Sequence, residues 1–191
     1  MDYIVLNHAC VKLTGSIVVY SDPYGLTEEP HDADLILITH SHYDHYSPED
    51  IAKVANKDTL VITPKDIKHP GRSFGLVPTD QLVLDDYVVE AVPAYNIGKD
   101  FHPKEKNWLG YVLSMDGKKI YFAGDTDDTP EAEAVRCDLA FLPVGGKYTC
   151  NVEEAVKLAK AIGAQITVPY HYGVVAGSPE DGKRFVELLN K

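Results

Sequence analysis

Cysteine is scarce in this chain of 191 residues, with only 3 in total. Cys10, Cys137 and Cys150 are far apart, odd in number and without a C-x-x-C pair. A disulfide framework or a zinc knuckle needs paired cysteines at short, defined spacings. We therefore expect reduced thiols and no cysteine-based scaffold.

Basic residues and long apolar runs are also lacking. The 18 lysines and arginines face 29 acids, which gives a formal net charge of −11. Such a chain repels a polyanion, so nucleic acid is not expected as a partner. No apolar run approaches the length of a membrane span, and residues 1–8 lack the pattern of a signal peptide. We expect a cytoplasmic protein with no membrane partner, and the sequence leaves its oligomeric state open.

Common catalytic motifs are missing as well. The chain contains neither a G-x-S-x-G nucleophile motif nor a phosphate-binding glycine loop. Nothing therefore indicates a Ser, Cys or Lys nucleophile. With 45% hydrophobic residues the chain can bury one good core, so we expect a single domain over residues 1–191.

The most informative stretch is an apolar run, 35–38, followed at once by polar residues. The run predicts a strand buried on both faces, which delivers His40, His42, Asp44 and His45 into the turn that follows it. Imidazole and carboxylate suit zinc, manganese and iron. Three imidazoles and one carboxylate within six residues exceed what one tetrahedral ion takes from so short a turn, so the pattern indicates two ions. A solvated loop rich in His is the alternative.

A helix is expected directly after this turn. Ser47 is a good N-cap, and Pro48 suits the first helical position. Asp50 occupies the position at which a capping box has an acidic residue. The polar turn is thus held between a strand and a helix, as metal and catalytic sites usually are. Because alternate residues of an extended segment point the same way, His40 and His42 should reach one ion, while the pair after the bend reaches another.

Further elements are predicted along the chain. An antiparallel meander should open it, and Asp116-Gly117 is a strong hairpin signal. A helix is expected from Asn151, which has Glu154 at the capping-box position, and another after Ser178. The predicted strands are 3–6, 10–13, 17–20, 59–63, 76–84, 87–92, 108–115, 118–122, 138–143 and 165–170.

Two of these strands also end in a metal-binding residue type. Asp125 follows the strand 118–122, after Gly124, which lets the backbone bend close to a ligand. His171 follows the strand 165–170. As alternatives, Asp125 starts only a turn and His171 is a structural histidine.

These segments together resemble a known family. The motif at 40–45 matches the H-x-H-x-D-H motif of the metallo-β-lactamase-fold superfamily, and 124–126 and 170–173 match as well. The chain looks most like the small metal-dependent hydrolases that include the ascorbate-6-phosphate-lactonase-like proteins, from Asn7 to His171. The resemblance implies an α/β fold, a four-layer αββα sandwich of two mixed sheets flanked by helices.

The resemblance also implies a binuclear centre. Two divalent ions would hold a bridging hydroxide as nucleophile, and Asp44 would orient it and accept its proton. Zinc is the first expectation, with manganese or iron as alternatives. The implied ligands are His40, His42 and a third His on one ion, Asp44, His45 and His171 on the other, and Asp125 between them.

The third imidazole is where this chain departs from the superfamily. Many members place it at the end of a strand, where this chain has residues 94–96 and no His. Only His69 and His102 lie between the motif and Asp125. His69 is in a loop expected at the surface, so we predict that His102 completes the set, with Asn96 or a water as the fallback.

The surroundings of the site are predicted from neighbouring loops. His8 and Asp22 lie in segments that run close to the metals in the resembling family, and are expected behind the ligands or in the pocket. As alternatives, His8 is a satisfied loop histidine and Asp22 a turn former. The long loop 93–107 is expected to form a wall or lid. Lys147 on a second rim loop, with the lysines of the first, makes an anionic small-molecule substrate plausible.

We therefore predict a metal-dependent hydrolase acting on a small, anionic ester, lactone or phosphoester. A di-iron oxygen or nitric-oxide reductase on the same fold is one alternative. The members compared have Glu where this chain has His42, and they carry an electron-transfer domain. A metal-binding module without catalysis is the other alternative, against which the ligand set argues.

Overall fold

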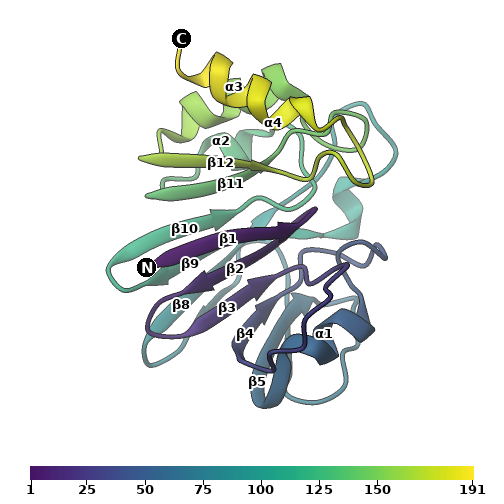
Figure 1. Ribbon diagram of the computed structural model, residues 1–191, viewed down its shortest axis with the longest axis vertical. Helices are drawn as coiled ribbons and strands as arrows, with labels where there is room; N and C mark the ends of the chain where they lie inside the picture. Colours follow the sequence, from purple (N-terminus) through teal and green to yellow (C-terminus); the bar gives the residue numbers. More distant parts are fainter.

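The computed structural model describes residues 1–191 as two six-stranded sheets packed face to face (Figure 1). In the first sheet the opening strands form the predicted antiparallel meander, and the remaining strands run parallel. Its order is β1 (Asp2–Asn7), β2 (Cys10–Thr14), β3 (Val18–Ser21), β4 (Ala33–Leu37), β5 (Ala55–Pro64) and β6 (Ser73–Leu76).

The second sheet is mixed in the same way. Its first four strands in chain order are antiparallel, and the last two are added in parallel. Its order is β12 (Ile166–Tyr170), β11 (Leu139–Pro143), β10 (Lys118–Phe122), β9 (Leu109–Met115), β8 (Tyr87–Pro93) and β7 (Gln81–Val83). The predicted hairpin turn at Asp116-Gly117 joins β9 and β10, with φ of 52° and 70° at these two residues.

Helices cover the outer faces of the sheets. They are α1 (Pro48–Val54), α2 (Pro130–Glu133), α3 (Val152–Ile162) and α4 (Glu180–Leu189), and a 3-10 turn spans Lys104–Lys106. In Figure 1, α3 and α4 lie beside β11 and β12, and α1 lies beside β4 and β5. Neither α2 nor the 3-10 turn was predicted from the sequence, because each is a single turn with no apolar periodicity.

Three hydrophobic clusters define the layers. The largest, of 20 buried residues, fills the space between the sheets, and includes Leu35 from β4 and Phe122 from β10. A second, of 16 residues, packs the three C-terminal helices on the second sheet, and a third, of 9, packs α1 on the first sheet. This is the predicted αββα sandwich, and the fold class is confirmed. A single domain over residues 1–191 stays a prediction.

The stretch 76–84 is not one strand as predicted. β6 joins the first sheet and β7 the second, so the chain crosses between the sheets from Leu76 to Gln81. Pro78 lacks the amide that a ladder needs, and Thr79 has a left-handed φ of 75°. A turn at Thr79-Asp80, where the N–H of Asp80 donates to the carbonyl of Val77 at 3.1 Å, therefore makes this crossing.

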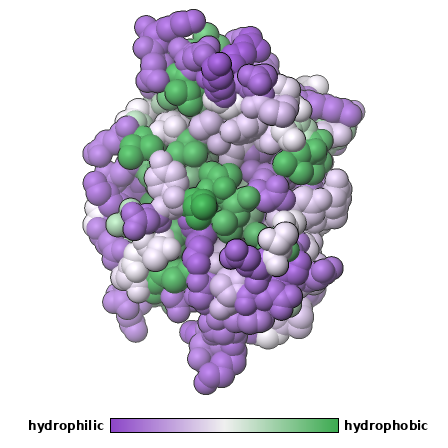
Figure 2. Space-filling view, viewed as in Figure 1, coloured by the Kyte–Doolittle hydropathy of each residue, from purple (hydrophilic) through white to green (hydrophobic).

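Part of the first sheet's outer face carries exposed apolar side chains. Figure 2 shows hydrophobic atoms gathered where Figure 1 places β1, a strand in which Ile4 and Leu6 are exposed. They border a cavity of about 320 Å³ that also contacts Leu26 and Val54. None of the helices is long and apolar enough to cross a membrane.

Candidate metal centre

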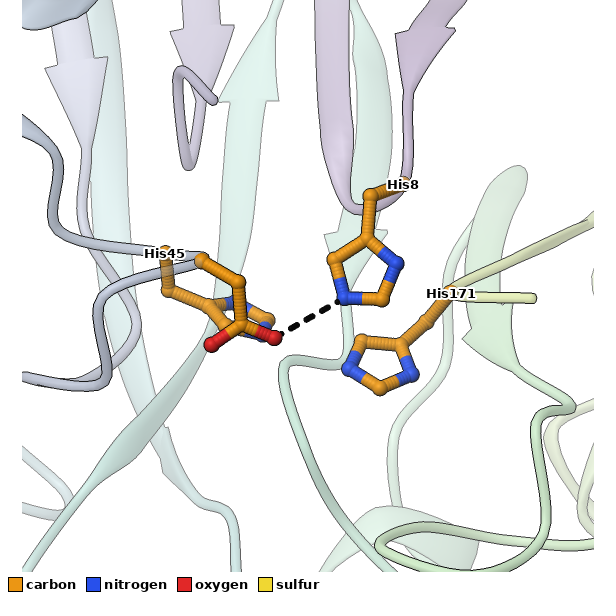
Figure 3. A group of neighbouring side chains, drawn as sticks. His8, His45 and His171 are labelled. Atoms are coloured by element: carbon orange, nitrogen blue, oxygen red, sulfur yellow. Dashed lines mark hydrogen bonds and ion pairs between the residues drawn. The ribbon is translucent and has the colours of Figure 1, made fainter. Parts of the chain in front are cut away.

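The candidate ligands come from loops of both sheets that meet at one edge of the sandwich. In the first sheet, His8 follows β1, and residues 40–45 follow β4. In the second sheet, His102 lies between β8 and β9, Asp125 follows β10, and His171 follows β12. Figure 3 shows His8, His45 and His171 pointing toward one another from three separate segments.

Unusual backbone conformations place several of these side chains. His8, Asp22 and His171 have left-handed φ values of 50°, 40° and 56°, which few residues other than glycine adopt. Such conformations cluster at functional sites, where the surrounding structure holds them. The backbone N–H of His171 donates to the carbonyl of His8 at 3.0 Å, which joins the two sheets beside the site.

The structure brings all seven predicted ligands together in overlapping groups. Within each group the candidate ligand atoms lie within 4.8 Å of one another. Six of the seven side chains are buried and His42 is half-buried. The groups are His40, His42 and His102; His40, His45 and Asp125; and His8, Asp44, His45 and His171.

Asp125 lies between the two predicted ligand sets. Its Oδ2 is 3.2 Å from Nε2 of His102 and 3.0 Å from Nε2 of His171. Its Oδ1 is 3.3 Å from Nε2 of His45, and its Oδ2 is 3.9 Å from Nε2 of His40. One carboxylate therefore contacts imidazoles of both sets, as the predicted bridging role requires.

Asp22 orients His45. Its Oδ2 accepts from Nδ1 of His45 at 2.8 Å, and its two oxygens accept from the backbone N–H and the hydroxyl of Thr39 at 2.8 Å and 2.7 Å. Because a carboxylate only accepts, Nδ1 of His45 carries a proton, and Nε2 faces the centre. Asp22 thus lies directly behind a candidate ligand.

Asn96 orients His102 as Asp22 orients His45. Its Oδ1 accepts from the backbone N–H and from Nδ1 of His102, both at 3.0 Å, and the carbonyl of Tyr148 lies 3.1 Å from the same ring nitrogen. Nε2 of His102 therefore faces Asp125. The amide nitrogen of Asn96 donates to Oδ1 of Asp127, at 3.1 Å, and to the Tyr148 carbonyl, so Asn96 lies behind His102 and not in a ligand position.

Several buried polar atoms of this centre lack a partner within the protein. Eight buried side-chain nitrogens and oxygens lack a hydrogen-bond partner, and six of them belong to this centre. An unpaired buried polar atom costs roughly 1–3 kcal/mol, so their convergence calls for a ligand. Imidazole nitrogen with carboxylate oxygen fits zinc, manganese or iron. The six atoms are His8 Nδ1, His45 Nε2, His102 Nε2, Asp125 Oδ1 and both ring nitrogens of His171.

Protonation states at the centre mostly suit metal binding. Burial lowers the pKa of His40 far below its ordinary value, and also lowers that of His42. Burial alone would raise the pKa of Asp125, but His171 and His45 beside it hold that pKa well below its ordinary value. His45 is the exception, because Asp125 and Asp22 outweigh its burial and raise its pKa. Its Nε2 proton must leave before that atom can bind a cation.

His8 lies inside the centre. Its Nε2 is 3.1 Å from Oδ2 of Asp44, the contact drawn in Figure 3, and its ring centre is 3.9 Å from that of His171. An ionised carboxylate only accepts, so this contact requires a proton on Nε2 of His8. The geometry therefore favours an Nε2–H that donates to Asp44 over a metal bond through the same atom.

A cavity of about 250 Å³ opens onto the donors. The sequence did not point to several residues that line this cavity, because they belong to no recognisable motif. It also missed Trp108, whose ring centre lies 5.0 Å from that of His40 and 4.8 Å from that of His42. The cavity is lined by His42, Tyr43, Asp44, Phe101, His102, Asp125, Tyr148 and Val175.

The lysines expected near the substrate do not line this cavity. Lys99 donates to Asp127 at 2.6 Å and to the Thr149 carbonyl, and Lys104 pairs with Glu131 at 2.6 Å. Lys147 is exposed, with its Nζ 4.9 Å from the ring centre of Tyr148, so it meets the cavity only through that ring.

His69 lies away from the centre, as expected. It is half-buried, and its Nδ1 is 3.2 Å from the hydroxyl of Tyr46. It belongs to none of the three groups of candidate ligands.

Comparison with known proteins agrees with this fold and donor set. Residues 4–171 match the family model of the beta-lactamase superfamily domain. A UPF0173 metal-dependent hydrolase of Thermococcus onnurineus is 35% identical over 207 residues, which cover 95% of this chain and 90% of the relative. A candidate metal-dependent hydrolase from Parabacteroides distasonis superposes with a TM-score of 0.80 at 35% identity, covering 91% of this chain and 83% of that one.

A more distant structure shares the fold alone. CmlA, a diiron beta-hydroxylase from Streptomyces venezuelae, has a TM-score of 0.71 at 16% identity, and the match covers 97% of this chain and 49% of CmlA.

The fold and the motif residues thus define a member of the metallo-β-lactamase superfamily. Within it, the chain belongs to the UPF0173 family of metal-dependent hydrolases. The finer placement beside the ascorbate-6-phosphate-lactonase-like proteins stays a prediction.

Proposed function

We propose that the protein is a hydrolase that holds two divalent ions and cleaves a small ester, lactone or phosphoester. One observation carries the proposal. Buried imidazoles from both sheets converge on the carboxylate of Asp125, His40 and His102 from one predicted set and His45 and His171 from the other, and several of their ring nitrogens lack a hydrogen-bond partner. No other part of the fold leaves so many buried polar atoms without a hydrogen-bond partner.

We divide the ligands between the two ions as the family resemblance implies. Zinc, manganese and iron all suit such donors. When bound, the ions would act as Lewis acids on a carbonyl or phosphoryl oxygen and would lower the pKa of water. The proposed ligands are His40, His42 and His102 for the first ion and Asp44, His45 and His171 for the second, with Asp125 shared.

Asp44 is the proposed catalytic base, because it lines the cavity. Burial alone would raise its pKa, but the hydrogen bond from His8 and the nearby His45 lower it, so the carboxylate is ionised at neutral pH. His8 occupies Oδ2 and thereby fixes the plane of the carboxylate. Asp44 can then orient an attacking water and accept its proton.

Several wider expectations rest on the same proposal. A small molecule is the proposed partner, and the cavity of about 250 Å³ suits one. A cytoplasmic location and the absence of nucleic-acid and membrane partners stay predictions. A di-iron oxidoreductase is the competing function, and CmlA supports it by fold alone.

Asp125→Asn tests the proposal, with Asp58→Asn, an exposed carboxylate, as the matched control. Protein loaded with excess zinc or manganese and then desalted should contain close to two ions per chain, and should hydrolyse members of an ester, lactone and phosphoester panel. Asp125→Asn should fold, retain about one ion and lose most activity, because a bridging carboxylate relieves repulsion between two cations. A ceiling of one ion in the unaltered protein, or full activity in Asp125→Asn, contradicts the proposal. Oxygen consumption by iron-loaded protein without hydrolysis would favour the oxidoreductase.

A further inference from the structure

The walls of the cavity above the donors are apolar and aromatic. Beyond the candidate ligands, its lining consists of Tyr43, Phe101, Tyr148 and Val175. Tyr43 is 67% exposed and Phe101 is 42% exposed, and both border the same cavity. We call these four residues the aromatic rim.

The rim is assembled from separate loops. Tyr43 lies in the loop after β4, Phe101 in the loop between β8 and β9, Tyr148 after β11 and Val175 after β12. Phe101 and Tyr148 pack edge to face, with ring centres 4.6 Å apart and an interplanar angle of 86°. Neighbouring rings thus hold each other, so the rim is a preformed surface, which limits the entropy lost on binding.

Two further exposed apolar residues lie on the loops that carry the aromatic rim. Ile97 is 57% exposed in the loop that carries Phe101, and Val174 is 58% exposed beside Val175. Exposed apolar side chains on the loops around a polar site are typical of a ligand site. Loops from both sheets therefore present apolar surface around one cavity.

No lysine or arginine lines the cavity, and the whole chain has a net charge of −11. Lys99 pairs with Asp127 and Lys104 with Glu131, and the exposed Lys147 has its Nζ 4.9 Å from the ring centre of Tyr148 without lining the cavity. An anionic group inside the cavity would lose hydration without gaining a basic side chain from its walls, whereas an apolar group would bury surface there.

We propose that the aromatic rim selects uncharged substrates that carry an aryl or bulky alkyl substituent near the bond that is cleaved. The substituent packs between Phe101, Tyr148 and Tyr43 while the reacting group meets the donors below. A cavity of roughly 150 Å³ can hold benzene, so about 250 Å³ leaves room for one ring and the reacting group. The inference rests on the proposed hydrolase function, and it replaces the anionic substrate expected from the lysines.

A matched series of esters tests the substituent alone. The trifluoroethyl esters of propanoic acid, 3-phenylpropanoic acid and succinic acid, the last as its monoester, share leaving group and linker. They differ only in a terminal hydrogen, phenyl or carboxylate. For the zinc-loaded protein we expect kcat/KM to be about 10- to 100-fold higher for the phenyl ester than for the propanoate. The succinate should gain nothing over the propanoate.

Variants locate the preference. In Phe101→Ala and Tyr148→Ala the ratio of kcat/KM between the phenyl ester and the propanoate should fall toward one, with unchanged metal content. Phe74→Ala removes an equally exposed ring from β6 and should leave that ratio as it is. A ratio near one in the unaltered protein, or the succinate as the best substrate, overturns the inference.

Binding separates this inference from the proposed function. The unreactive amides 3-phenylpropanamide and succinamate can be titrated into the protein and followed by calorimetry, without any turnover. Preferential binding of the phenyl amide, weakened about 10-fold or more in Phe101→Ala, supports the rim even if none of the esters is cleaved. Equal binding, or preference for succinamate, overturns it even if hydrolysis is observed.

Discussion

At the scale of single residues, the orientation of each imidazole depends on the group that holds its second ring nitrogen. The carboxylate of Asp22 holds Nδ1 of His45, and the amide oxygen of Asn96 holds Nδ1 of His102. In both cases Nε2 is left facing Asp125. These partners fix the ring before any ion arrives, so their loss should weaken metal binding even though they are not ligands.

A comparison of three variants tests the third imidazole. His102→Ala should lose one ion from the pair without unfolding the protein, and Asn96→Ala should weaken that ion by roughly 10- to 100-fold, because its role is to orient His102. His69→Ala is the control and should bind both ions normally, since the His69 side chain hydrogen-bonds Tyr46 and belongs to none of the groups of candidate ligands. Metal affinities measured by competition with a chelator decide the assignment. An unchanged His102→Ala beside a weakened Asn96→Ala would overturn it.

His8 can be tested by separating metal content from turnover. His8→Ala removes the donor to Asp44, so kcat should fall about 10-fold or more while two ions remain bound. His8→Gln keeps an N–H of similar reach and should recover part of the rate. Elemental analysis gives the first quantity and steady-state kinetics the second. Loss of one ion in His8→Ala would show that His8 is a ligand instead.

At the scale of elements, the end of β10 is shaped by a close approach of backbone. Gly124 has φ of 67°, and a Cβ there would lie 2.8 Å from the carbonyl oxygen of Leu109 and 3.1 Å from Cβ of Thr39. Its N–H donates to the hydroxyl of Tyr170 at 2.7 Å. The strand end that carries Asp125 therefore packs against segments of both sheets.

Gly124→Ala should accordingly destabilise the protein and weaken metal binding. Gly117→Ala is a matched control, because it has φ of 70° but no atom within 4 Å of a new Cβ. The control should cost about 1–2 kcal/mol for the left-handed backbone alone, and Gly124→Ala should cost more because of the clash. Urea unfolding of the two variants measures the difference. An equal loss of unfolding free energy in the two variants would mean that the backbone around Gly124 shifts to accommodate the new Cβ.

The first turn of α1 supports a neighbouring loop. The side chain of Ser47 accepts from the backbone N–H of Asp50, as predicted for the N-cap. The carboxylate of Asp50 does not complete a capping box. It accepts from the backbone N–H groups of Gly25 and Leu26 at 2.9 Å and 3.0 Å, and from Lys53 at 2.9 Å.

These donors make the stability depend on pH. Burial alone would raise the pKa of Asp50, but Lys53, Ser47 and the two backbone amides lower it. A carboxyl with a lowered folded pKa stabilises the protein above its unfolded pKa of about 3.9 and loses that effect as pH falls through the folded value. Asp50→Asn should therefore cost about 1–3 kcal/mol at pH 7, and the difference should shrink below about pH 4. Thermal melts of both proteins from pH 3 to pH 7 test this, and a constant difference would contradict it.

At the scale of the whole molecule, the candidate centre links the two sheets. His8 and the 40–45 loop belong to the first sheet, whereas His102, Asp125 and His171 belong to the second. An ion held by both groups would cross-link the layers in the folded state only. Metal binding is therefore expected to add to the free energy of unfolding.

Removal of metal should lower the melting temperature. At a metal concentration of 100 times Kd, binding contributes about 2.7 kcal/mol, which corresponds to roughly 5–10 °C for a chain of this size. Melts with and without a chelator measure the shift, and added zinc or manganese should reverse it. The same melting temperature in protein verified as metal-loaded and metal-free would show that the ions do not join the sheets.

The sequence alone determined the features that depend on local pattern. An apolar run followed at once by polar residues predicted β4 and the loop 40–45, and Asp125 and His171 were found because each follows a predicted strand. Pro169 has no N–H for a second neighbouring strand, which agrees with the edge position of β12. Neighbouring residues determine which strands are buried and where they end, so these predictions did not depend on contacts between distant segments.

Only the tertiary structure decided which side chains from distant loops meet. Asn96 and His102 were both candidates for one position, and their roles separated once Asn96 was seen to hold His102. The contact of His8 with Asp44 joins residues 36 apart, and Tyr43, Phe101 and Tyr148 form one rim from three loops without any shared motif. Two lysines of the loop 93–107, Lys99 and Lys104, were already paired with Asp127 and Glu131 within the fold. Side chains far apart in sequence can satisfy or orient one another only after the sheets have packed, and no local pattern encodes that geometry.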